Sequence, residues 1–189
     1  LSVFSTDSLF AGLVEKRTNL CDSLKNVLVS MPLDTNKIKT AYKFYNEYSN
    51  YKWAIELLNI AYEEAGKLKR RDMQLDYLMH MVNFNMGLNN FNAAKSKLKI
   101  LKYLSYKTKS FNNYFFALGA ILQKKVEEGE YEYALVNARE MEQEAIRLNN
   151  HVGIIQGKLV MANYYLAQDN KREAIALYKE ISQSTNASH

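Results

Sequence analysis

Four polar residues recur at a spacing of 40 along the chain: Lys43, Asn83, Gln123 and Asn163. All four carry side-chain N–H donors, and the three amides also accept hydrogen bonds. A row of such groups along one surface can hold the backbone of an extended or helical peptide without reading its sequence. The same groups can instead cap or bridge neighbouring helices, or face water, so the spacing leaves these roles open.

Residue types that perform catalysis or bind metals are sparse. The sequence contains neither an HExxH nor a CxxC motif, and its histidines are isolated at His80, His151 and His189. Cys21 falls in an apolar helical pattern, so we expect a core residue. The carboxylates of Glu127–Glu132 form a run that is typical of a solvated helix end. We therefore expect no catalytic residue, no metal site and no cofactor, and we do not expect an enzyme.

The elements that carry these residues follow from an internal repeat with the same spacing. Each repeat has an alanine at the same position, at Ala54, Ala94, Ala134 and Ala174. Five residues earlier comes a turn-forming residue, at Ser49, Asn89, Gly129 and Asp169. Apolar residues on both sides of the turn recur at steps of three and four, which predicts a helix, a short polar turn and a second helix. One such pair cannot bury its apolar stripe alone, so neighbouring pairs must stack.

This spacing predicts eight helices with the following approximate ranges: 35–48, 52–67, 72–87, 92–106, 111–127, 131–148, 152–167 and 171–183. Residues 1–31 predict a separate leading helix, with Asp7 or Ser8 as its cap and Pro32 at its end. We interpret it as a linker helix or as the second helix of a preceding unit. Since the chain begins with Leu1 rather than Met, we expect a piece cut from a larger protein.

These positions resemble the tetratricopeptide repeat. The segment Gly129-Glu130-Tyr131-Glu132-Tyr133-Ala134 matches the family's Gly-x-aromatic-x-x-Ala turn, and the pair Ala162 and Tyr165 matches its first helix. The resemblance covers residues 33–184, but the period is 40 rather than 34 and the proline that ends each family unit is missing. It implies an all-α, right-handed α–α superhelix, a solenoid of four hairpins at 35–67, 72–106, 111–148 and 152–184. These repeats would occupy residues 32–189.

The resemblance also suggests a binding groove. The first helices of stacked pairs line the concave face, and in the family an asparagine on these helices often contacts the backbone of a bound peptide. This implies the same role for Asn83 and Asn163, and extends to Gln123 and Lys43. Further groove-facing candidates on the same helices are Lys39, Met79, Phe116 and Leu159.

The charge is mildly positive overall but unevenly distributed. The net charge is +5, and no acidic residue occurs between Asp76 and Glu127. Within that stretch lies a run of lysines at Lys95, Lys97, Lys99, Lys102, Lys107 and Lys109. Solvated helix faces that contact acidic neighbours explain such a run, and a nucleic-acid or anionic-surface patch is the alternative, which we rank below a protein partner.

The composition limits the class of protein. The 189 residues are 48% hydrophobic, enough for one domain with a sizeable core, and no apolar run is long enough to span a membrane. The single cysteine cannot form an internal disulfide, which favours a reducing compartment.

We therefore expect a non-enzymatic module that binds a protein or peptide. It would be the interaction or sensor part of a larger bacterial signalling or regulatory protein in the cytoplasm. The alternatives are binding of nucleic acid or an anionic surface through Lys95–Lys109, and a homodimerisation arm.

Overall fold

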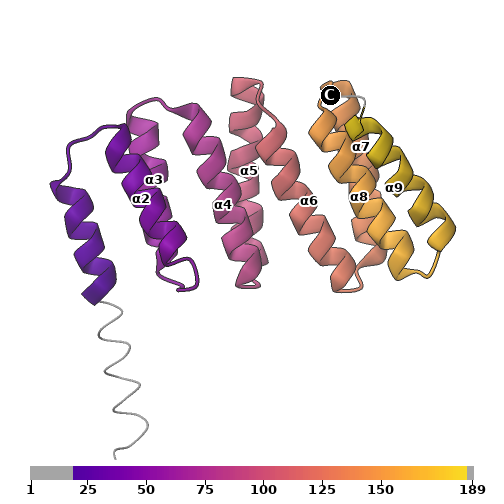
Figure 1. Cartoon of the computed structure of the whole chain (residues 1–189), viewed down its shortest axis with the longest axis horizontal. Coiled ribbons are helices and arrows are strands. Elements are labelled where there is room, and N and C mark those ends of the chain that lie inside the picture. Colours follow the sequence, from indigo (N-terminus) through magenta and orange to yellow (C-terminus); the bar gives the residue numbers. More distant parts are fainter. Residues whose placement is uncertain (1–18, 187–189) are drawn as a thin grey trace, which may run out of the picture. The chain divides into compact units, whose positions relative to one another are not determined.

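A computed structural model describes residues 19–186 of the chain, and these residues form helices joined by short turns, with no β-strand among them. A first helix covers residues 19–30. It is followed by α2 (Thr35–Glu47), α3 (Ala54–Lys67), α4 (Arg71–Gly87), α5 (Phe91–Thr108), α6 (Asn112–Glu127), α7 (Tyr131–Arg147), α8 (His151–Ala167) and α9 (Lys171–Asn186) (Figure 1). The all-α class is confirmed, and each predicted helix end lies within three residues of an observed one. The predicted leading helix is described only from residue 19, so its proposed caps Asp7 and Ser8 lie outside the described residues.

A residue with a left-handed backbone recurs at a spacing of 20, once in each turn from α3 to α9. The φ angles are 56° at Lys69, 55° at Asn89, 56° at Lys109, 81° at Gly129, 49° at Asn149 and 55° at Asp169. Glycine adopts this conformation without steric cost, and asparagine and aspartate tolerate it. The two lysines gain no such help from their side chains, so the turn itself must hold them there.

An equivalent hydrogen bond closes each of these six turns. The N–H that follows the left-handed residue donates to the carbonyl five residues earlier in the chain, at N···O distances of 2.8–3.1 Å. The donor–acceptor pairs are Arg70–Ala65, Asn90–Asn85, Ser110–Ser105, Glu130–Lys125, Asn150–Ala145 and Asn170–Tyr165. This is the Schellman closure of a helix C-terminus, which satisfies carbonyls that the helix leaves unpaired.

The core repeats with the same step. The alanines of the internal repeat, Ala54, Ala94, Ala134 and Ala174, are each at most 1% exposed. A second buried set recurs at a spacing of 20 on successive helices, at Ala61, Met81, Leu101, Ile121, Met141 and Met161. After each of these turns, the next helix therefore buries the equivalent set of positions.

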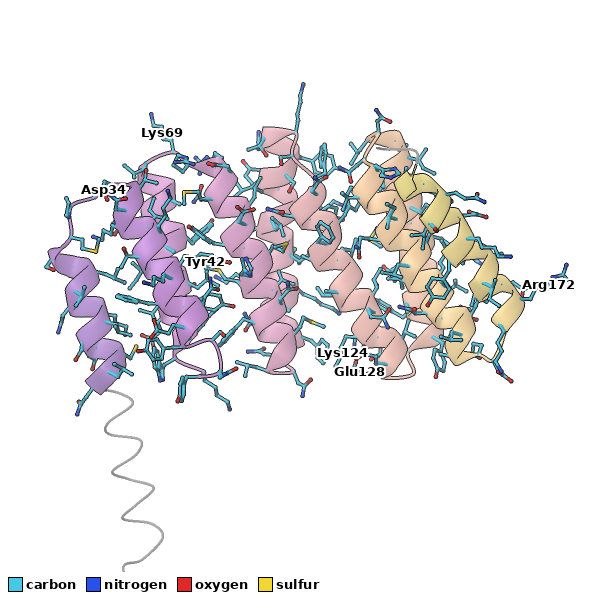
Figure 2. The ribbon with its side chains drawn as sticks, in the orientation of Figure 1. Asp34, Tyr42, Lys69, Lys124, Glu128 and Arg172 are labelled. Atoms are coloured by element: carbon cyan, nitrogen blue, oxygen red, sulfur yellow. The ribbon has the colours of Figure 1, made fainter. Side chains whose placement is uncertain are left out.

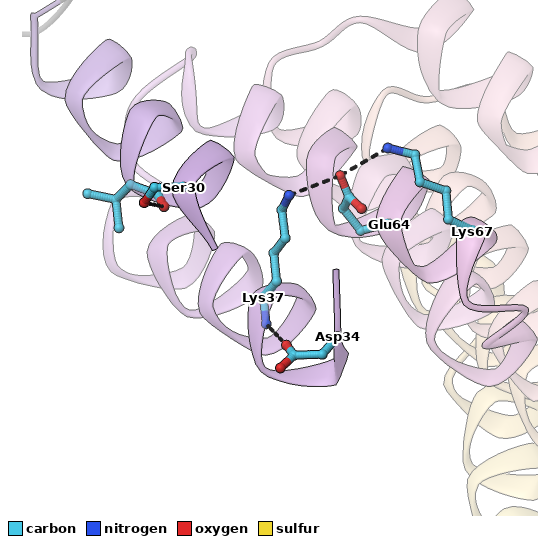
Figure 3. A network of polar contacts seen from close by, with 6 residues as sticks. Ser30, Asp34, Lys37, Glu64 and Lys67 are labelled. Carbon is cyan, nitrogen blue, oxygen red and sulfur yellow. Dashed lines mark hydrogen bonds and ion pairs between the residues drawn. The ribbon is translucent and has the colours of Figure 1, made fainter. Parts of the chain in front are cut away.

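The chain divides into two compact units, Leu1–Tyr77 and Leu78–His189, and the division falls within α4. In the first unit, α2 packs against α3. Figure 3 shows the polar link between them, in which Glu64 on α3 pairs with Lys37 on α2 at 3.5 Å and with Lys67 at 3.1 Å. Asp34 caps α2 by accepting a hydrogen bond from the backbone N–H of Lys37.

The turn between α2 and α3 departs from the pattern. Ser49 belongs to the predicted set of turn residues, but its backbone is not left-handed, and α3 begins at Ala54 rather than at the predicted residue 52. The aromatic rings of Tyr48, Tyr51 and Trp53 gather in this turn, with centroids 5.5–6.4 Å apart. We attribute the later helix start to this aromatic cluster, which occupies the residues that elsewhere begin the second helix.

In the second unit, glycines let α8 lie close to its neighbours α6 and α7. A Cβ atom on Gly153 would come within 2.7 Å of the Phe115 ring on α6, and one on Gly157 within 3.1 Å of the Ala138 carbonyl on α7. The turn that joins α6 to α7 is visible in Figure 2 near the labelled Lys124 and Glu128. Close approach of α8 matters because α6 and α8 together carry most of the lining of one cavity.

Neither long apolar helices nor clustered metal ligands occur in the described part of the chain. No helix among these residues is long and apolar enough to cross a bilayer. Nor do three or more histidine, cysteine, aspartate or glutamate side chains gather within metal-binding reach of each other between residues 19 and 186.

The left-handed turns predict opposite effects of glycine at two lysines of similar exposure. Lys109→Gly should raise the free energy of unfolding by about 1 kcal/mol, because glycine removes the strain at a positive φ. Lys99→Gly, in the exposed middle of α5, should lower it by about 1 kcal/mol. Urea denaturation followed by circular dichroism measures both, and a decrease for Lys109→Gly would contradict the role given to this turn.

Candidate functional site

A cavity of about 500 Å³ lies among α4, α6 and α8 of the second unit. Its lining comes from one face of each helix: Met79 and Asn83 on α4, then Phe116, Gly119, Ala120 and Gln123 on α6, then Gln156, Leu159, Val160 and Asn163 on α8. Most of these positions are related by the spacing of the internal repeat, as in Met79, Gly119 and Leu159. The repeat therefore presents equivalent faces of three helices to one hollow.

Two further hollows continue this surface along α6. One, of about 460 Å³, is lined by Met86, Gly87, Asn89, Ala120, Gln123, Lys124 and Glu127. The other, of about 440 Å³, is lined by Gln123, Val126, Glu127, Tyr131, Asn163, Leu166 and Ala167. Since Gln123 borders all three, we call the continuous surface the α6 groove. Its main cavity is lined by uncharged residues, and charge appears only toward the end of α6, where Lys124 and Glu127 pair at 3.6 Å.

The structure brings six of the eight predicted groove residues together. Asn83, Gln123 and Asn163 line the main cavity, as do Met79, Phe116 and Leu159. The other two, Lys39 and Lys43, lie exposed on α2 in the first unit. The binding role of all eight stays a prediction.

The amides of the groove have different hydrogen-bonding states. Asn163 donates through Nδ2 to Oε1 of Gln123 at 2.5 Å, and its Oδ1 accepts from the hydroxyl of Tyr178 on α9. Asn163 therefore bridges neighbouring helices, one of the roles that its sequence position leaves open. This bond fixes the acceptor end of the Gln123 amide, whose Nε2 donor has no partner in the described part of the chain. Asn83 is exposed and has no hydrogen-bond partner among the described residues.

Sequence reasoning missed four lining residues: Gly119, Ala120, Gln156 and Val160. Gly119 leaves room for the Gln156 side chain, whose Oε1 would lie only 2.6 Å from a Cβ at that position. The repeat itself could have found two of them, since Gly119 lies one period before Leu159 and Gln156 lies one period after Phe116. Extending each candidate by one period would have placed both in the groove.

A cluster of ionisable groups joins α5, α6 and α7 outside the groove. The Lys102 ammonium pairs with Oε1 of Glu144 at 2.8 Å, and Tyr106 and Tyr114 both donate hydrogen bonds to this carboxylate, at 2.5 and 3.1 Å. Burial raises the pKa of Tyr114 to about 12. Burial alone would raise the pKa of Glu144, but the bonds from Lys102 and Tyr106 outweigh it and lower that pKa. The cluster holds a charged carboxylate in place and thereby ties the three helices together.

The remaining candidates for chemistry are the cysteine, the histidines and the acidic run. Cys21 is 3% exposed in the helix at 19–30, and burial raises the pKa of its thiol. His80 is half-buried on α4, His151 is exposed at the start of α8, and His189 lies outside the described residues. Glu128 and Glu130, from the acidic run, pair with the buried Lys125 at 2.9 and 2.7 Å. No ionisable side chain lines the main cavity, so its surface offers apolar contact and amide hydrogen bonds.

Comparison with known proteins gives no relative for this chain: no protein-family model, curated protein or solved structure matches it.

The Glu144 cluster predicts a pH-dependent contribution to stability. Glu144→Gln should lower the free energy of unfolding at pH 7 by about 1–2 kcal/mol, because it weakens three hydrogen bonds to a charged acceptor. Since the pKa of Glu144 is lowered from its ordinary 4.5 in the folded state, its stabilisation is present above that pH and disappears as the pH falls through the lowered pKa. The unfolding free energies of variant and wild type should therefore converge in acid.

The control for this experiment is Glu140→Gln, an exposed residue on the same helix. It should change stability little at any pH. Urea titrations between pH 3 and pH 7 compare the three proteins, and a gap between Glu144→Gln and wild type that stays constant across this range would contradict the assignment.

Proposed function

We propose that the second unit is a non-enzymatic binding module that holds a peptide segment in the α6 groove. The observation that carries this proposal is the convergence of equivalent faces of α4, α6 and α8 on one uncharged cavity of about 500 Å³. Cavities of this size with apolar walls and a few fixed polar groups are typical of binding sites. A peptide presents both the apolar side chains and the backbone carbonyls that this surface would satisfy.

The lining suggests how the segment would be held. Met79, Phe116 and Leu159 supply apolar surface, and Phe116 is 45% exposed, so its ring is available to a partner. The free Nε2 of Gln123 and the amide of Asn83 would bond to the peptide backbone. Asn163 would act on Gln123 rather than on the peptide, because its own amide is already bonded at both ends.

The wider assignment rests on the resemblance to tetratricopeptide repeats. We propose that the hairpins form a right-handed superhelix of that kind, and that the chain is the interaction or sensor part of a larger bacterial regulatory protein in the cytoplasm. The regular succession of turns and the buried alanines support it, since both are expected of stacked helical hairpins.

The groove predicts binding that depends on Phe116 and Asn83 and hardly on salt. Random peptides of about twelve residues, displayed on phage, would be selected on the whole chain and then titrated by calorimetry. Phe116→Ala and Asn83→Ala should each weaken the selected peptides about tenfold, as expected for loss of an apolar anchor or a buried hydrogen bond. Raising the salt should change the affinity little, because the main cavity has no charged lining residue.

Two substitutions outside the groove serve as matched controls. Ile175→Ala removes an apolar side chain that is 53% exposed on α9, and Asn92→Ala removes an exposed amide on α5. Both should leave peptide affinity unchanged. If the selected peptides bind all four variants as they bind wild type, the α6 groove is not the binding surface.

A homodimerisation arm is a second candidate, favoured by the apolar surface of the first unit. Val27, Val29 and Leu33, in and just after the helix at 19–30, are 47%, 76% and 46% exposed. Burial of this surface between two copies predicts a dimer in multi-angle light scattering that Val29→Asp converts to monomer. A monomer at every concentration tested would exclude it.

A further inference from the structure

A row of exposed residues follows one face of α5 in the second unit: Lys95, Lys99, Tyr103 and Lys107. They are spaced by four residues, so each lies about 6 Å farther along the helix than the one before. Tyr103 is 61% exposed, more than any other aromatic side chain among residues 19–186. We call this set the α5 row.

The positive charges of the α5 row are not neutralised by any carboxylate of residues 19–186. No carboxylate of the described residues lies within 4 Å of the ammonium groups of Lys95, Lys99 or Lys107, and α5 itself has no acidic residue. Lys102, on the same helix, differs because it is paired with Glu144 at 2.8 Å. Three unpaired lysines that line up beside an exposed ring leave a surface that attracts a polyanion.

Two of the three lysines of the row, Lys95 and Lys107, lie close to aromatic rings. The Lys107 ammonium lies 5.6 Å from the centre of the Tyr103 ring, and the Lys95 ammonium lies 5.6 Å from the centre of the Tyr133 ring on α7. Tyr133 is itself 41% exposed. Two ammonium groups of the row therefore lie beside partly exposed tyrosine rings.

We propose that the α5 row binds single-stranded nucleic acid, with Lys95, Lys99 and Lys107 on phosphates of one strand and a base stacked on Tyr103. Surfaces that bind single strands without sequence preference combine a basic track with aromatic side chains on which bases stack. An anionic membrane fits less well, because a membrane-surface helix needs an exposed apolar face. Among the aliphatic side chains of α5, Ala94 and Leu101 are buried in the core, and Ile100 alone is exposed, at 39%.

This surface is separate from the α6 groove. None of its four residues lines a hollow of that groove, and the two surfaces differ in chemistry, since the main cavity is uncharged. Binding at the α5 row should therefore fall steeply with salt, whereas binding in the groove should not.

Fluorescence anisotropy with a labelled oligouridylate of about 20 nucleotides tests the proposal on the whole chain. Between about 50 and 200 mM KCl, log K should fall against log[salt] with a slope of about −2, as expected for three phosphate contacts on a single strand. The triple variant Lys95→Gln/Lys99→Gln/Lys107→Gln should bring that slope near zero. Tyr103→Ala should weaken binding at least about fivefold and leave the slope unchanged, because it removes stacking but no charge.

A control triple variant, Lys52→Gln/Arg172→Gln/Lys179→Gln, removes the same charge from exposed positions elsewhere. It should bind the oligonucleotide as wild type does, and circular dichroism should show that all variants are folded. The proposal is overturned if wild type does not bind at about 50 mM KCl, or if both triple variants weaken binding equally. It is also overturned if the Lys95/Lys99/Lys107 triple variant binds the oligonucleotide as wild type does but no longer sediments with phosphatidylserine vesicles.

Discussion

The turn that closes α3, α4, α5, α6, α7 and α8 is the constraint on which the rest of this structure depends. Six helices end in the same way, with a left-handed residue that recurs every 20 positions. The N–H of the residue that follows it donates a hydrogen bond to the carbonyl five residues before that donor. Because these ends are equivalent, each following helix begins in the same rotational phase. The buried positions then recur with the same spacing, from Ala61 to Met161, and the core is continued from one hairpin to the next within each unit.

The α6 groove follows from the equivalent rotation of successive helices. Two turns return the chain to a helix of the same direction, so α4, α6 and α8 present equivalent faces to one cavity. Close approach of α8, which Gly153 and Gly157 permit, brings Asn163 within hydrogen-bonding distance of Gln123. The amide of Gln123 is thereby held by its oxygen, and a preorganised donor costs less entropy when it binds a partner. The two proposed binding sites differ in chemistry. The α6 groove offers neutral groups held in place, whereas the α5 row offers unpaired positive charge.

The sequence predicted the helices well because their determinants are local. Alanines and apolar residues at helical spacing located α2 to α9 and the buried positions of Ala54, Ala94, Ala134 and Ala174. It did not reveal the regular succession of left-handed turns, because Lys69 and Lys109 have no preference for the conformation that they adopt. Nor could it show that Ser49 fails to form such a turn, since the aromatic cluster there depends on contacts between side chains. Six groove candidates were brought together by the repeat, whereas the bonding of Asn163 to Gln123 and Tyr178 depends on side-chain conformations that spacing does not fix.

The regular step from helix to helix has a consequence for how such a chain can change in length. Gain or loss of one helix with its turn would reverse the direction of every later helix. It would also exchange groove positions for positions equivalent to the α5 row, because Met79 and Asn83 lie 20 residues before Lys99 and Tyr103. Gain or loss of two helices would preserve every face and only lengthen or shorten the groove. Duplication or deletion of gene segments should therefore be tolerated in whole periods of the repeat, and the reach of the groove would vary in whole hairpins while its chemistry is retained.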